Sequence, residues 1–158
     1  MYRTVEDFLQ EWQEEAKLTK SVISAVTDEK KNQAIAEGHN TLSWLSWHLA
    51  TTPAFFAGGV GLELHTSADL ANEPQSIKEI VETYEAVTAE LAKQASTLSD
   101  EALGEQVDFL GAKVARGVVL RKLVNHQIHH RGQMTVLLRQ AGLTVPGVYG
   151  PTKEQQLG

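Results

Sequence analysis

The stretch LVNHQIHHRGQMTVLL, residues 123–138, combines the apolar spacing of a buried helix with three of the chain's six histidines. His126 and His130 are four residues apart, so in a helix their side chains lie on one face, with Cβ atoms about 5–6 Å apart. Two imidazoles at that spacing reach a common ion at about 2.0–2.1 Å each. His129 is displaced by about 100° around the helix and cannot easily share that ion with both. From spacing alone, metal ligands and hydrogen-bonded core histidines are about equally good interpretations.

Four long segments carry apolar residues at steps of three and four, which is typical of helices with one buried face. They span about Val5 to Val26, Thr41 to Ala57, Ile77 to Ser99 and Val118 to Ala141. Capping residues support these boundaries: Thr4 with Asp7, Asn40, Ser76 with Glu79, and Gly142 after the last segment. The pattern predicts an all-α fold, a four-helix bundle.

The chain has 158 residues, which fits one domain over residues 1–158. The connections before and after the third predicted helix are long for a bundle, so simple up-down-up-down order is not assured. The second of them, DEALGEQVDFLGAKVARG at residues 100–117, has room for a short irregular or extended piece.

Composition excludes several classes of function. The chain has no cysteine, so thiolate ligands and a protein thiol nucleophile are excluded, and any thiol must arrive as a substrate. The net charge is −6 and the 14 lysines and arginines form no long cluster, which argues against a nucleic-acid partner. No apolar run approaches 18 residues, and the acidic N-terminal segment does not resemble a signal peptide. We therefore expect a cytoplasmic protein that does not cross a membrane.

A second helix offers a third histidine for the same ion. His48 lies in LSWLSWHLA, close to the apolar stripe, and Trp44 and Trp47 are placed to shield it from water. Bundles commonly build metal sites from side chains on facing helices. One histidine from this helix and two from the last give a three-histidine set with open coordination positions, which is typical of catalytic sites. His39 and His65 fall in predicted loops, where we expect solvated side chains.

These motifs resemble a known family. HQIHHRGQ, residues 126–133, is similar to the H-x-x-x-H-R-G-Q signature of the last helix in the DinB/YfiT-like superfamily. LSWLSWHLA looks like the family's second-helix segment, which ends in its first metal histidine, and GLTVPG is similar to its usual exit. The resemblance implies an up-down-down-up four-helix bundle, usually dimeric. It also implies a divalent metal held by His48, His126 and His130, with zinc or nickel as first choices and manganese or iron as alternatives.

The resemblance also suggests roles for the residues that follow His130. Gly132 would allow a neighbouring helix to approach closely. Arg131 should point off the metal face, where a structural ion pair is favoured over a catalytic role. Gln133 is either a hydrogen-bond partner that orients a ligand histidine or a surface amide. No catalytic residue can be assigned, because spacing supports neither of the two carboxylates considered, Glu37 and Asp108.

The sequence thus predicts a divalent-metal-dependent enzyme acting on a small molecule. Characterised relatives include S-transferases that use bacillithiol or mycothiol and a mycothiol-dependent maleylpyruvate isomerase, so a low-molecular-weight thiol is an expected partner. S-transfer and metal-assisted hydrolysis both suit such an ion. The alternatives are a non-catalytic bundle that binds a metal or small ligand, and a structural protein whose histidines are core residues. We also expect a homodimer, and metal affinity that falls below about pH 6.5.

Overall fold

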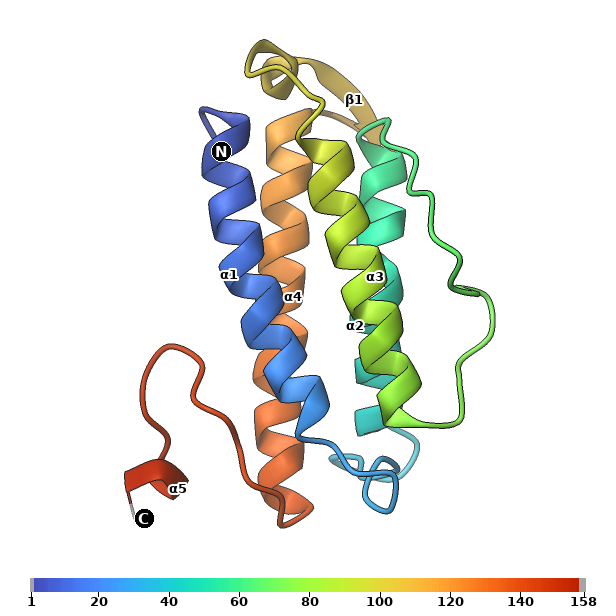
Figure 1. Ribbon diagram of the computed structural model, residues 1–158, viewed down its shortest axis with the longest axis vertical. Helices are drawn as coiled ribbons and strands as arrows, with labels where there is room; N and C mark the ends of the chain where they lie inside the picture. The colour runs from blue at the N-terminus through green and yellow to red at the C-terminus, as the bar shows by residue number, and fades with distance from the viewer. Residues whose placement is uncertain (1, 157–158) are drawn as a thin grey trace.

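The computed structural model describes residues 2–156, and four long helices run side by side through it (Figure 1). They are α1 (Val5–Ser24), α2 (Leu42–Gly59), α3 (Ile77–Ala95) and α4 (Arg116–Gln140). Between α3 and α4 lie a short 3₁₀ helix, η1 (Glu101–Gly104), and two strands, β1 (Gln106–Phe109) and β2 (Ala112–Ala115). A single turn, α5 (Lys153–Gln156), lies near the C-terminus. The predicted helical bundle is confirmed, and the all-α class is corrected by this small antiparallel sheet.

Each long helix packs against two others, with α1 and α2 both contacting α3 and α4. The apolar core has two parts. One part, near the hairpin, includes Phe8, Trp12 and Phe109. The other, toward the opposite end of the bundle, includes Ile23 and Tyr84. The middle of α4, where the histidines lie, passes from one part of the core to the other.

The helix starts show which capping predictions were right. The capping boxes at the starts of α1 and α3 are both present. The prediction of Asn40 as the cap of α2 is wrong, because Thr41 holds that position and its hydroxyl accepts from the backbone N–H of Trp44 at 3.1 Å. The backbone of Thr41 is extended and pairs with Ala34, which leaves its side chain free to cap.

Other helix boundaries also differ from the prediction: α1 ends at Ser24 rather than Val26, and α2 at Gly59 rather than Ala57. α3 ends at Ala95, four residues earlier than expected, because a turn and η1 follow it directly. α4 begins at Arg116 rather than Val118, immediately after β2. The Arg116 side chain donates to the backbone carbonyls of Val60 at 2.9 Å and Ala102 at 3.0 Å. These bonds attach the start of α4 to the segments that follow α2 and α3.

None of the helices within residues 2–156 has the length and hydropathy needed to cross a bilayer.

Candidate metal centre

Three imidazoles converge between α2 and α4. One ring nitrogen from each of His48, His126 and His130 lies within 4.8 Å of the other two. Nε2 of His48 is 3.0 Å from Nε2 of His126. Two nitrogens that are each about 2.0–2.1 Å from a common ion, at tetrahedral or octahedral angles, lie about 2.9–3.4 Å apart. The spacing of His48 and His126 therefore matches that of two ligands of one divalent cation, and the nitrogen of His130, within 4.8 Å of both, is close enough to join them after a small rotation of its ring.

The protonation state of the rings also fits a metal. All three side chains are half-buried, and burial is the main cause that lowers their pKa values. The effect is largest at His126, where burial first and then the neighbouring imidazoles, led by His130, lower the pKa to about 4. Near pH 7 the rings are therefore neutral, and a neutral imidazole is the form that binds a cation.

Gln133 orients one of the three histidines. Its Oε1 lies 2.8 Å from Nδ1 of His130, so it accepts a hydrogen bond when that nitrogen carries the proton. This tautomer leaves Nε2 of His130 with a free lone pair. The amide nitrogen of Gln133 lies 3.3 Å from Nε2 of His129, which is exposed and stands outside the three-histidine set. Of the two interpretations of Gln133, the structure favours the orienting hydrogen bond.

Only one of the two ring nitrogens of His126 is paired in the described part of the chain. Its Nδ1 is buried and has no hydrogen-bond partner within residues 2–156. Its Nε2 faces another imidazole nitrogen, that of His48. Buried polar groups are normally paired, so a histidine kept only for packing would be expected to have partners for its ring nitrogens. The unpaired Nδ1 does not by itself separate the two interpretations, because a metal-bound histidine also normally has a partner for its other ring nitrogen. The close approach of the two Nε2 atoms is the feature that a shared ion would explain.

A proline in α2 explains how the two helices are held together at the site. Pro53 has no N–H, so the carbonyl of Leu49, four residues earlier, lacks its usual helical donor. The side chain of Gln127 supplies that donor from α4, at 3.1 Å. The other end of the same amide accepts from the hydroxyl of Tyr84 on α3, also at 3.1 Å. This buried network fixes α2 against α4 next to His48 and His126, which adjoin Leu49 and Gln127 in the sequence.

Aromatic side chains shield the site, although not the pair that was predicted. Trp44 stacks on His48, with ring centroids 4.6 Å apart and planes within 14°. Phe56 lies 5.5 Å from His126 between ring centroids. Trp47 packs instead against the second part of the core, the part that includes Ile23 and Tyr84. Phe56 follows His48 by eight residues, about two helical turns, and that spacing is the signal that could have identified it.

Two predictions about α4 have opposite outcomes. Arg131 forms a buried ion pair with Glu15 on α1 at 2.6 Å and also donates to the Thr19 hydroxyl at 3.1 Å, so its predicted structural role is confirmed. The close approach predicted at Gly132 is wrong. That glycine is exposed, and a Cβ there would meet nothing within 4 Å.

The remaining candidates do not belong to the group of three histidines. His39, His65 and Glu37 are exposed in connections between helices. Asp108 lies on β1 and pairs with Lys113 at 3.3 Å, with both side chains exposed. In the described part of the chain, no carboxylate joins the group of histidines.

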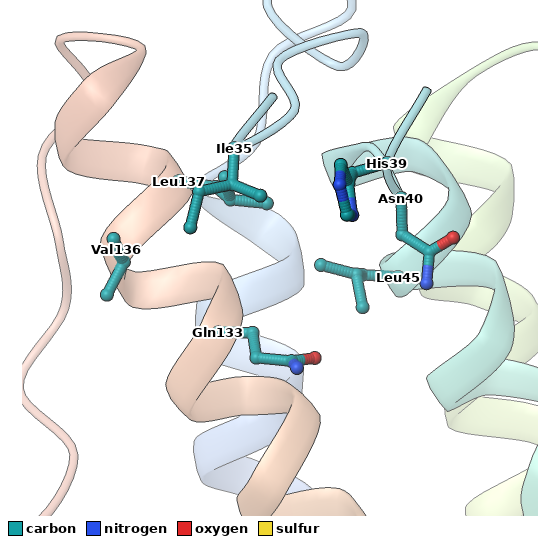
Figure 2. Close-up of a pocket in the computed structure, with 7 residues that line it drawn as sticks. All are labelled: Ile35, His39, Asn40, Leu45, Gln133, Val136 and Leu137. Atoms are coloured by element: carbon teal, nitrogen blue, oxygen red, sulfur yellow. The ribbon is translucent and has the colours of Figure 1, made fainter. Parts of the chain in front are cut away.

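A pocket of about 230 Å³ lies beside the site, between α4 and the start of α2 (Figure 2). We call it the α2/α4 pocket. Its apolar walls are Ile35, Leu45, Val136 and Leu137. Its polar walls are His39, Asn40 and Gln133. Gln133 therefore belongs both to this pocket and to the hydrogen bond that orients His130.

Comparisons with known proteins agree with the fold and the motifs. The sequence profile of the DinB family matches residues 1–157. The uncharacterized protein YrdA of Bacillus subtilis is 36% identical over 156 residues, which cover 98% of this chain and 93% of that protein. The crystal structure of a DinB-like protein from Bacillus cereus, 41% identical, superposes with a TM-score of 0.88 over 94% of this chain and 100% of that one. The DinB-like YjoA of B. subtilis, at 20% identity and a TM-score of 0.72 over 92% of this chain and 99% of that one, shares the fold.

Proposed function

Because the chain belongs to the DinB family, we propose that it is a divalent-metal-dependent enzyme whose ion is held by His48, His126 and His130. One observation carries the proposal: neutral imidazoles from two helices bring three donor nitrogens within 4.8 Å of one another. Nitrogen ligands of this kind suit zinc and nickel, our first choices, with manganese and iron as alternatives.

The chemistry of the site follows from its ligands. Three neutral imidazoles leave a divalent ion its full charge and vacant coordination positions, and such an ion, when bound, lowers the pKa of a coordinated water or thiol. The chain has no cysteine, so a reacting thiol is part of a substrate. Gln133 holds His130 in the tautomer that binds metal, while Trp44 and Phe56 limit the access of water. We propose S-transfer from a low-molecular-weight thiol, or hydrolysis of a small molecule, as the reaction.

Metal analysis of the purified protein tests the ligand set. We expect about one divalent ion per chain in the wild type, and loss of most of it in His126→Ala. His129→Ala is the matched control, since His129 is a neighbouring histidine on the same helix that stands outside the set. Retention of full metal content in His126→Ala, or equal loss in both variants, would refute the proposed ligands.

A thiol-transfer assay tests the reaction class. The metal-loaded protein is mixed with monochlorobimane and one of several low-molecular-weight thiols, including bacillithiol and mycothiol. S-transferase activity predicts faster formation of the fluorescent adduct with at least one thiol, and loss of the acceleration in His126→Ala. Absence of acceleration with every thiol would contradict S-transfer and leave hydrolysis to be tested with ester and amide substrates.

A second candidate function is a bundle that binds a metal or small ligand without catalysis. The observation that favours it is that, in the described part of the chain, no carboxylate joins the three histidines to move a proton. A protein that binds metal stoichiometrically, yet accelerates no reaction in either assay, would fit this candidate.

The proposal includes the architecture that the family resemblance implies. The connection 60–76 runs along the outside of the bundle from the end of α2 to the start of α3, which supports up-down-down-up order (Figure 1). We also propose a homodimer of single-domain chains, a cytoplasmic location and no nucleic-acid partner. Light scattering that finds only monomers would refute the dimer.

A further inference from the structure

We infer that the α2/α4 pocket binds the apolar group of a small, uncharged molecule whose polar head reaches the three histidines. The inference rests on the proposed metal site, because the metal would hold the head. To the proposed metal site it adds a second binding site on the protein, and it names the chemical class of the group that this second site binds.

The first argument is position. Leu45 precedes His48 by three residues on α2, and Gln133 follows His130 by three residues on α4. Both walls of the pocket therefore lie about one helical turn, roughly 5 Å, along the bundle from the ligand histidines. Figure 2 shows the Gln133 side chain reaching from α4 toward α2, with Leu45 opposite. A linker of three bonds, together with the bond from the ion to the head atom, spans about this distance, so one molecule can occupy both places.

The second argument is the chemistry of the walls. Leu45 and Leu137 are buried at the base, while Ile35 and Val136 are exposed, with 62% and 47% of their surface accessible. The polar lining residues are a histidine and two amides, and none of the lining residues is a lysine, arginine, aspartate or glutamate. An apolar ligand group would cover the exposed isoleucine and valine. A charged one would find no carboxylate, ammonium or guanidinium partner here and would lose its hydration.

The third argument is size. A cavity of about 150 Å³ lined by apolar side chains holds a benzene ring. At about 230 Å³ the pocket has room for such a ring and a short linker. It lies below the range of about 300–1,000 Å³ that is typical for drug-sized ligands. A phenyl ring or a short branched alkyl chain therefore fits.

Paired thiol probes on the Co²⁺-loaded protein test the inference. The probes are ethanethiol, 2-phenylethanethiol and 2-phenylethanethiol with a para-carboxylate, and the change in the visible absorption of Co²⁺ reports binding. The thiol serves only as a metal-binding head. We expect 2-phenylethanethiol to bind at least tenfold more tightly than ethanethiol, and the carboxylate to remove most of that gain.

Two variants locate the effect. Val136→Trp fills the pocket, and we expect it to reduce the tenfold preference to less than threefold while ethanethiol still binds. Val118→Trp is the control, since Val118 is a half-buried valine on the same helix that does not line this pocket. It should keep the preference.

The outcomes separate the pocket from the metal site. No Co²⁺ spectrum in the wild type would refute the proposed metal site. A normal spectrum with equal affinities for the two uncharged thiols would overturn the pocket inference alone. A second result would also overturn it: Val136→Trp loses the preference for 2-phenylethanethiol and, in light scattering, changes from dimer to monomer. The pocket would then be a contact between copies of the chain.

Discussion

Among the single residues that do not contact the proposed ion, Gln133 has the most direct influence on it. Its hydrogen bond to Nδ1 of His130, at 2.8 Å, keeps the free lone pair on Nε2. Loss of such an outer partner typically weakens metal affinity about 10–100-fold. We therefore expect a decrease of that size in Gln133→Ala, measured by competition with a chelator. His129→Ala should change the affinity less than threefold, and equal effects in both variants would argue against the orienting role.

The lowered pKa of His126 has a consequence for stability. Between about pH 6.5 and pH 4 the unfolded chain binds a proton at this residue that the folded, metal-free protein does not bind. The contribution of His126 to the free energy of unfolding is therefore fully present above pH 6.5, and it is lost as the pH falls through this window. A shift of one unit corresponds to about 1.4 kcal/mol, and with solvent screening we expect a loss of about 1–2 kcal/mol. Urea unfolding at pH 7 and pH 4.5 measures it. His126→Leu should have a smaller pH dependence than His39→Ala, and identical slopes would contradict this origin.

At the scale of secondary-structure elements, one glycine inside α4 and one just after its end lead to opposite predictions for stability. Gly132 is in the middle of the helix and a Cβ there meets open space, so Gly132→Ala should stabilise the protein by about 0.5–1 kcal/mol. Gly142 follows the helix with a φ of +73°, where a side chain is strained. Gly142→Ala should destabilise by about 1–2 kcal/mol. Thermal unfolding of both variants measures the difference, and a destabilising Gly132→Ala would restore the close approach expected from the sequence.

The contact between α2 and α4 depends on one buried amide. In Gln127→Leu, the carbonyl of Leu49 and the hydroxyl of Tyr84 both lose their partner. An unsatisfied buried polar group costs about 1–3 kcal/mol, and we expect a loss of stability in that range. Gln10→Leu, at an exposed position on α1, should stay within about 0.5 kcal/mol. Equal effects in urea unfolding would show that the network does not hold the helices together.

At the scale of the whole molecule, the spacing of apolar residues was sufficient to predict the bundle, whereas the set of converging histidines was predicted from spacing together with the family resemblance. The apolar stripes predicted all four helices, and the capping boxes at Thr4 and Ser76 fixed two of their starts. The pair of histidines four residues apart on α4 does lie on one face, and the rings of His126 and His130 are 4.4 Å apart between centroids.

What could not be predicted depends on contacts between segments distant in the sequence. From the sequence, Gln127 is only one more position on the buried face of a helix. Its role follows from the structure, because its side chain donates to the carbonyl of Leu49, which Pro53 leaves without a helical donor. The α2/α4 pocket combines a loop with parts of two helices, and helical spacing does not fix the path of a loop. Gly132 was misjudged for the same reason, because the sequence does not say which face of α4 a neighbouring helix will cover.

The most direct test of the account is a crystal structure of the zinc-loaded protein with anomalous diffraction measured at the zinc edge. The account predicts one strong peak between α2 and α4, about 2.0–2.1 Å from a ring nitrogen of each of His48, His126 and His130. A peak bound elsewhere, or rings that turn away from a common centre, would contradict it.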